Sequence, residues 1–242
     1  RGLMAWTGLQ VDISKIEKNK FKKQNADDWV ALMTPILKSF STEVGCEAAN
    51  VALQIYGGHG YIKDHGIEQL VRDARIAPIY EGTNGIQALD LVGRKMPMNT
   101  GRLLKSFFHV VKEYIEKNSF NYNLNEFMPP LIKSFSRLQQ VTSFMASKGL
   151  NNPEEAAGPA TDYLKMFSLV AIGYVWTQYA EISFNKQNDD PEGFYKAKIA
   201  SGKYYMLKIL PETGSIMSSI LSGAKYYNDD FDDKYFDSGF IL

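Results

Sequence analysis

Apolar residues recur three and four positions apart along most of the chain, a spacing typical of amphipathic helices. Asn25 is the predicted cap of the first clear helix, and Pro35 either bends this helix or divides it in two. The paired glycines of "YGGHGY" (56–61) then end it, because glycine adopts the positive φ of a helix C-cap. Its predicted apolar stripe comprises Val30, Met33, Leu37, Phe40, Val44, Ala48, Val51 and Ile55.

Two shorter helices are predicted after the paired glycines. The first lies in "GIEQLVRDARIA" (66–77), with Ile67, Leu70 and Val71 on one face. The second follows "APIYEGTNG" (77–85), is capped by Thr83 or Asn84, and has a core face of Ile86, Leu89 and Val92 or a near variant.

"KMPMNTG" (95–101) has the composition of a boundary. Beyond it the pattern predicts five helices, over 103–115, from Pro129 onward, over 162–186, over 193–210 and over 215–227. The last residues, 228–242, are predicted to form a strap on the surface. The helix opened by Pro129 has a predicted core face of Leu131, Phe135, Leu138, Val141 and Met145, and the middle of 162–186 is apolar all round. No β-branched alternation of useful length occurs, so the predicted class is all-α, with units of 1–98 and 99–242.

Composition restricts the partners. Among 242 residues, Lys+Arg and Asp+Glu both number 27, so the net charge attracts neither nucleic acid nor an anionic membrane. Met166 to Trp176, the longest nearly apolar run, is too short to span a bilayer. The single cysteine, Cys46, forms no disulfide within the chain, so we expect a reducing compartment and a cytoplasmic location. Because the first residue is Arg1 and the sequence there already has a helical pattern, we expect a fragment or a processed chain.

Several kinds of site are disfavoured. The histidines His59, His65 and His109 form no HExxH pair, and Cys46 has no partner at ligand spacing, so no metal site is expected. "GGHG" follows a predicted helix rather than a strand, so it lacks the context of a dinucleotide fingerprint. A Ser/His/Asp triad stays open, although no nucleophile elbow occurs.

Glu81 alone would be interpreted as a solvated acid near a helix start. Together, however, "QIYGGHGY", "RDAR" and "IYEGTNGIQ" (within 54–87) reproduce the order and spacing of a family motif. Residues 1–98 resemble the C-terminal helical domain of the acyl-CoA dehydrogenases. Residues 99–242 are similar to the extra helical domain of long bacterial members such as the methylthiopropanoyl-CoA dehydrogenases. The resemblance implies a truncated helical bundle of this family followed by a second helical bundle.

The resemblance also implies residue roles. Glu81 matches the family's usual catalytic base, and Gly82 matches the position against the acyl-CoA. Thr83, Asn84 and Gly85 match the turn that contacts FAD. The segment that approaches the dinucleotide part of FAD, in this family sometimes that of a neighbouring subunit, is matched by Gln54, Ile55, Tyr56, Gly57 and Gly58.

The implied reaction is α,β-dehydrogenation of an acyl-CoA, in which Glu81 removes the α-proton and a hydride passes to flavin. Apolar surroundings raise the pKa of a carboxylate and make it a stronger base, so we expect Glu81 in a dry pocket. The resemblance also implies that the backbone N–H of Glu81 binds the thioester oxygen, where negative charge develops. An electron-transfer acceptor and a homo-oligomer, dimer or tetramer, are the implied partners. The chain alone is expected to hold no flavin and to be inactive. Acyl-CoA oxidase, an alkylation-response flavoprotein and a non-catalytic helical interaction module are the alternatives.

Overall fold

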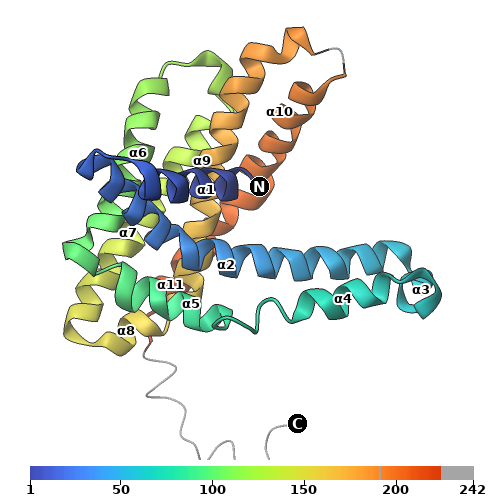
Figure 1. Cartoon of the computed structure of the whole chain (residues 1–242), viewed down its shortest axis with the longest axis horizontal. Helices are drawn as coiled ribbons and strands as arrows, with labels where there is room; N and C mark the ends of the chain where they lie inside the picture. The colour runs from blue at the N-terminus through green and yellow to red at the C-terminus, as the bar shows by residue number, and fades with distance from the viewer. Residues whose placement is uncertain (191, 225–242) are drawn as a thin grey trace, which may run out of the picture. The chain divides into compact units, whose positions relative to one another are not determined.

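The computed structural model describes residues 1–190 and 192–224, and these residues form helices and turns with no strand (Figure 1). The all-α prediction is therefore confirmed for the described residues. They form two compact units, Arg1–Met98 and a second unit that begins at Asn99. The strap predicted over 228–242 lies outside the described residues.

A single long helix, α2, is the scaffold of the first unit. The helices α1, α4 and α5 all pack against it. A 3₁₀ turn, Lys63–His65, precedes α4, and a π-helical turn, Leu91–Lys95, follows α5. The helices of this unit are α1 (Gly2–Ile16), α2 (Lys20–Tyr56), α3 (Gly58–Tyr61), α4 (Ile67–Arg75) and α5 (Asn84–Asp90).

The start of α2 differs from its prediction. Asn19 is the cap, and its side chain accepts hydrogen bonds from the backbone N–H groups of Phe21 at 3.0 Å and Lys22 at 3.2 Å. Asn25 lies inside the helix, so the predicted cap was wrong by nearly two turns. The helix continues through Pro35, which is buried. The end of the helix is as predicted, because Gly57 follows it with a φ of 59°.

The predicted apolar stripe of α2 is covered over only half its length. Met33 is buried and Leu37 half-buried, whereas Val44, Val51 and Ile55 are exposed. The predicted core face of α5 is wrong at two of its three positions, because Ile86 and Leu89 are exposed, whereas Val92 is buried as predicted and Ala88 is buried as well. Periodicity identified apolar faces correctly as helical but did not identify what covers them.

Two tryptophan side chains form part of the contact between α1 and α2. The rings of Trp6 and Trp29 lie with centroids 4.0 Å apart. Trp29 also donates its indole N–H to the hydroxyl of Thr7 at 3.2 Å, which satisfies the indole donor where it is buried. The chain is helical from Gly2 to Ile16, as its pattern predicts, and these aromatic contacts attach that helix to α2.

The second unit is a helical bundle around α9. This helix packs against α7, α10 and α11, and its side chains also contact α6, since the Phe107 and Phe167 rings lie 4.8 Å apart. A π-helical turn, Tyr205–Ile209, and a 3₁₀ turn, Leu210–Glu212, follow α10. The helices are α6 (Met98–Asn118), α7 (Met128–Asn151), α8 (Pro153–Ala157), α9 (Ala160–Lys186), α10 (Phe194–Tyr204) and α11 (Thr213–Leu221).

The helices α7 and α9 match their predictions closely. All five predicted core residues of α7 are buried, and the middle of α9 is buried on nearly every side. Between them lies one buried polar pair, in which the hydroxyls of Thr142 and Tyr163 are 2.8 Å apart. Thr142 also donates to the Leu138 carbonyl at 2.7 Å, whereas the Tyr163 hydroxyl has no other partner within residues 1–190 and 192–224.

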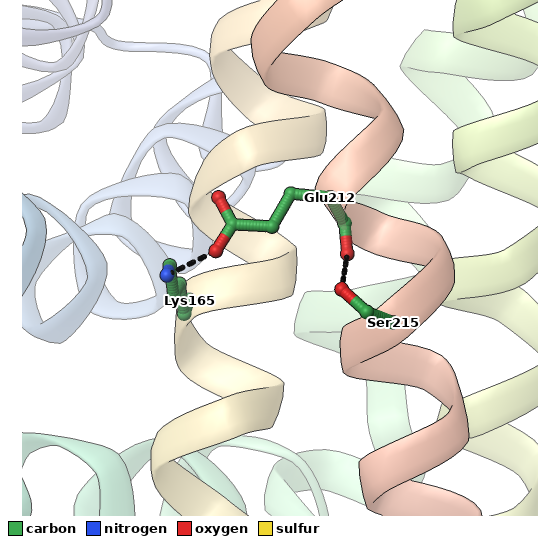
Figure 2. Close-up of polar contacts among 3 residues, drawn as sticks. All are labelled: Lys165, Glu212 and Ser215. Carbon is green, nitrogen blue, oxygen red and sulfur yellow. Dashed lines mark hydrogen bonds and ion pairs between the residues drawn. The ribbon is translucent and has the colours of Figure 1, made fainter.

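A surface ion pair connects α9 with the turn before α11 (Figure 2). Lys165 Nζ lies 2.5 Å from Glu212 Oε1, and Ser215 donates its hydroxyl to the Glu212 carbonyl at 2.9 Å. Both charged side chains are more than two-fifths exposed, so the pair contributes no more than about 1 kcal/mol to stability.

None of the helices in the described ranges combines the length and the apolar character that a membrane-spanning segment requires.

The Thr142–Tyr163 pair predicts an asymmetric effect of two similar substitutions. Thr142→Val leaves the Tyr163 hydroxyl buried without a partner and should cost about 1–3 kcal/mol of unfolding free energy. Tyr163→Phe leaves Thr142 its bond to Leu138 and should cost less than about 1 kcal/mol. Urea unfolding followed by circular dichroism measures both, and equal losses would contradict this account of the pair.

Buried tyrosines predict a loss of stability at alkaline pH. Burial raises the pKa of Tyr174 to about 12, with the Glu181 carboxylate adding to the effect. Burial also raises the pKa of Tyr114, Tyr163 and Tyr205. An unfolded tyrosine loses its proton near pH 10, so above that pH the unfolded chain binds fewer protons than the folded chain and stability falls as pH rises.

The fall should begin near pH 10 and continue to pH 12, with about 1.4 kcal/mol per pH unit for each tyrosine that stays protonated in the folded state. Urea midpoints at pH 9, 10 and 11 measure it. Tyr163→Phe should lessen the slope, and a variant slope identical to that of the parent chain would show that burial of Tyr163 is not a cause.

Candidate functional site

The candidate site is the turn between α4 and α5 that carries Glu81. The N–H groups of Ile79 and Tyr80 both donate to the Ile76 carbonyl, at 3.0 and 3.1 Å, and continue α4 as a tight turn. Glu81 and Gly82 then adopt positive φ values of 54° and 79°. The chain reverses there, and α5 begins directly afterwards.

Gly82 is required by this geometry on two grounds. Its φ lies in the left-handed region that other residues rarely adopt. A Cβ at this position would also lie 3.0 Å from Gln87 Nε2. That same Gln87 amide donates to the Glu81 carbonyl at 3.2 Å, so α5 holds the turn from one side.

Lys38 of α2 holds the turn from the other side. Its ammonium donates to the carbonyls of Pro78 at 3.3 Å and Gly82 at 2.8 Å, and to Asn84 Oδ1 at 2.9 Å. An ammonium has three donors, and here three oxygens accept them. The two carbonyls lie on either side of the Ile79-Tyr80-Glu81 segment, so one cation closes this segment into a loop.

Asn84 docks the start of α5 on α2. Its side-chain amide donates to the Ser39 carbonyl at 3.2 Å and to Glu43 Oε1 at 3.1 Å, while its backbone N–H donates to the Pro78 carbonyl at 3.1 Å. The helix is capped by Thr83, whose hydroxyl accepts from the Ile86 N–H at 3.3 Å, as its sequence predicts. The side chains of Thr83 and Asn84 are therefore both used within the chain.

These bonds account for a strained backbone at a surface position. A non-glycine residue in the left-handed region costs about 1–3 kcal/mol, as Glu81 does here. Hydrogen bonds to a charged group contribute about 1.5–3 kcal/mol each, so those of Lys38 are sufficient to offset that cost. Apolar burial contributes less, because the Ile79 and Tyr80 side chains are about half exposed.

Glu81 itself leaves two polar groups without partners among the described residues. Its carboxylate forms no hydrogen bond or ion pair there, and its backbone N–H has no acceptor. The side chain is exposed, so the described residues do not form the dry pocket that the sequence led us to expect. The arrangement is a fixed backbone that presents a free carboxylate and a free N–H together.

The second group of predicted residues, Gln54 to Gly58, lies elsewhere. It forms the end of α2 and the turn into α3, at the far end of α2 from the start of α5 (Figure 1). At about 1.5 Å per helical residue, Lys38 and Gly57 are separated by about 28 Å along α2. A Cβ added to Gly57 or Gly58 would meet nothing within 4 Å, so there is open space beside this backbone. The structure therefore brings Glu81–Gly85 together but not with Gln54–Gly58.

Lys38 and Gln87 belong to the site but are not among the residues predicted from the sequence. A signal for Lys38 exists, because it interrupts an apolar stretch between Leu37 and Phe40 and precedes Thr42 by one helical turn. Thr42 lies next to the same Asn84 amide, at 3.2 Å from Oδ1. A polar pair inside an apolar stripe thus marks where another segment docks.

The described residues contain no cluster of His, Cys, Asp and Glu that could hold a metal ion. A pocket of about 340 Å³ does occur in the second unit, between the start of α7 and the Met206–Thr213 segment. Lys133 and Arg137 line it, and Arg137 Nη1 donates to Thr213 Oγ1 at 3.1 Å. It includes none of the residues predicted from the sequence.

Comparison with known families matches both parts of the chain. Residues 19–96 match the C-terminal domain of acyl-CoA dehydrogenases. Residues 107–229, about half of the chain, match the domain described as "Acetyl-CoA dehydrogenase C-terminal like".

Individual relatives are similar over most of this chain. The 3-methylmercaptopropionyl-CoA dehydrogenase of Ruegeria pomeroyi is 29% identical over 227 residues, which are 91% of this chain and 38% of the relative. A butyryl-CoA dehydrogenase of Syntrophomonas wolfei is 24% identical over 217 residues, or 88% and 35% of the two chains.

The crystal structure of Caenorhabditis elegans ACDH-11 in complex with C11-CoA superposes with a TM-score of 0.70 at 18% identity, over 96% of this chain and 38% of that chain. At this identity the superposition shows the fold alone. The chain thus spans a little over a third of the length of the relatives it matches. From the two domain matches, this chain belongs to the acyl-CoA dehydrogenase family.

Proposed function

We propose that the complete protein catalyses α,β-dehydrogenation of an acyl-CoA thioester, with Glu81 as the base. The observation that carries the proposal is that the carboxylate and the backbone N–H of Glu81 have no partner in the described part of the chain, while Lys38 binds the carbonyls on either side. The family membership of the chain supports the same assignment.

Each group of Glu81 has a task in this reaction. The carboxylate takes the proton from the α-carbon while a hydride leaves the β-carbon for the acceptor. The electron pair of the broken α C–H bond then forms the carbon–carbon double bond. Negative charge grows on the thioester oxygen as the proton leaves, and the Glu81 N–H is a donor for that oxygen. Gly82 would lie against the acyl-CoA with its backbone, since the Gln87 amide occupies the space where a Gly82 side chain would be.

FAD, when bound, would supply the hydride acceptor. The Thr83–Gly85 turn would contact it through backbone groups, because the Thr83 and Asn84 side chains are engaged within the chain. The open space beside Gly57 and Gly58 fits a close approach of a second part of the cofactor. Lys38, which binds the turn, and Gly57 are about 28 Å apart along α2. We therefore assign the two groups to the cofactors of different subunits in a homo-oligomer.

An electron-transfer acceptor for the reduced enzyme and a cytoplasmic location complete the proposal. Two of the relatives are named for short acyl groups, butyryl and 3-methylmercaptopropionyl, and the structural neighbour is in complex with C11-CoA, so butyryl-CoA, 3-methylmercaptopropionyl-CoA and a C11 acyl-CoA are the substrates to test first.

Glu81→Gln in the complete protein should keep bound flavin and lower kcat by about 10²–10⁴-fold, because glutamine keeps the size of the side chain but is no base. Dye-linked reduction with butyryl-CoA and 3-methylmercaptopropionyl-CoA measures this effect. Glu47→Gln is the matched control, since Glu47 is an exposed acid of α2 whose side chain forms no hydrogen bond or ion pair with the described residues.

Full activity of the Glu81→Gln protein with flavin bound would remove Glu81 as the base. Stoichiometric hydrogen peroxide from the parent protein, without reduction of the dye, would instead indicate an oxidase on the same fold.

A further inference from the structure

Lys38 is the residue that ties both sides of the Glu81 turn to the scaffold helix. We propose that Lys38 is a positioning residue for catalysis: by binding the carbonyls of Pro78 and Gly82, it fixes the place from which Glu81 removes the proton. This inference rests on the proposed function, because it concerns the same reaction. It adds a residue more than forty positions away in the sequence.

The three bonds of Lys38 suit an ammonium and no other common side chain. The acceptors are two backbone carbonyls and one amide oxygen, all neutral, so the half-buried cation has no carboxylate partner among the described residues. A neutral side chain would lose the charge-assisted character of these bonds. Arginine keeps the charge, but its planar guanidinium does not direct three N–H groups from one nitrogen atom to three separate oxygens.

The docking of α5 does not depend on Lys38 alone. Asn84 still bonds to Ser39 and Glu43 of α2, and Cys46 still donates to the Ala74 carbonyl, which connects α2 to α4, when the lysine is replaced. Loss of Lys38 should therefore loosen the turn while both flanking helices stay in place. The expected defect is in the chemical step rather than in folding.

The experiment uses the complete protein with four variants: Lys38→Met, the matched control Lys23→Met, Glu81→Gln, and the double variant Lys38→Met with Glu81→Gln. Lys23 is an exposed lysine of the same helix, and its side chain has no partner among the described residues. Bound flavin, kcat, KM and the isotope effect of a substrate deuterated at the α-carbon are measured for each. Amide exchange over residues 79–84 reports on the turn itself.

Lys38→Met should keep flavin, lower kcat by about 10- to 100-fold and change KM less than about threefold, because small misplacement of a catalytic group slows the chemical step. The α-deuterium isotope effect should rise, since proton removal becomes more rate-limiting. Amides 79–84 should exchange faster than in Lys23→Met. In the Glu81→Gln background the same substitution should lower kcat no further, because Lys38 acts through Glu81.

Two outcomes would overturn the inference while leaving the proposed function intact. One is a Lys38→Met protein with flavin bound and kcat within twofold of Lys23→Met. The other is an equal loss from Lys38→Met with and without Glu81→Gln, which would indicate a general structural effect. An active Glu81→Gln protein would refute the proposed function itself. If Lys38→Met does not fold, Lys38→Gln, which keeps the stem and a donor, is measured in the same way.

Discussion

Among the described residues, Lys38 is the one that binds carbonyls on both sides of the turn that carries Glu81. Lys38 donates to oxygens on both sides of Ile79-Tyr80-Glu81, and this segment has little apolar burial of its own. A hydrophobic core confers stability without direction, whereas three charge-assisted hydrogen bonds fix both position and orientation. The left-handed backbone of Glu81 is maintained because these directed bonds leave the turn no relaxed alternative at similar energy.

The second unit shows how far periodicity alone predicts a fold. The α7 positions from Leu131 to Met145 are all buried because α8, α9 and α11 pack against that helix within the unit. The same reasoning failed for Val51 and Ile55 of α2 and for Ile86 of α5, which are apolar and exposed. The spacing of apolar residues determines which of them share a face, but it contains no information on whether another element covers that face.

The candidate site was predictable where it depends on local chemistry. Threonine is a preferred helix cap and glycine adopts a positive φ without steric cost, so the residue types alone favour the observed conformations of Thr83 and Gly82. Lys38 was not predictable in this way, because its partners are 40 to 46 residues further along the chain and polar pairing has no periodic pattern. Helix periodicity places Lys38 beside Thr42, yet only the folded turn shows that both surround the Asn84 amide.

A carboxylate that works as a base has conflicting needs. Its position must be fixed, but every hydrogen bond donated to the carboxylate itself stabilises the charged form and weakens the base. At Glu81 the donors bind the backbone instead: Lys38 donates to the Gly82 carbonyl and Gln87 to the Glu81 carbonyl, while the carboxylate has no partner among the described residues. Under the proposed function, bonds to neighbouring atoms fix the position of the base, and the surroundings set its basicity. Under the proposed function, exclusion of water from Glu81 then depends on the bound substrate and cofactor, because the described residues leave the side chain exposed.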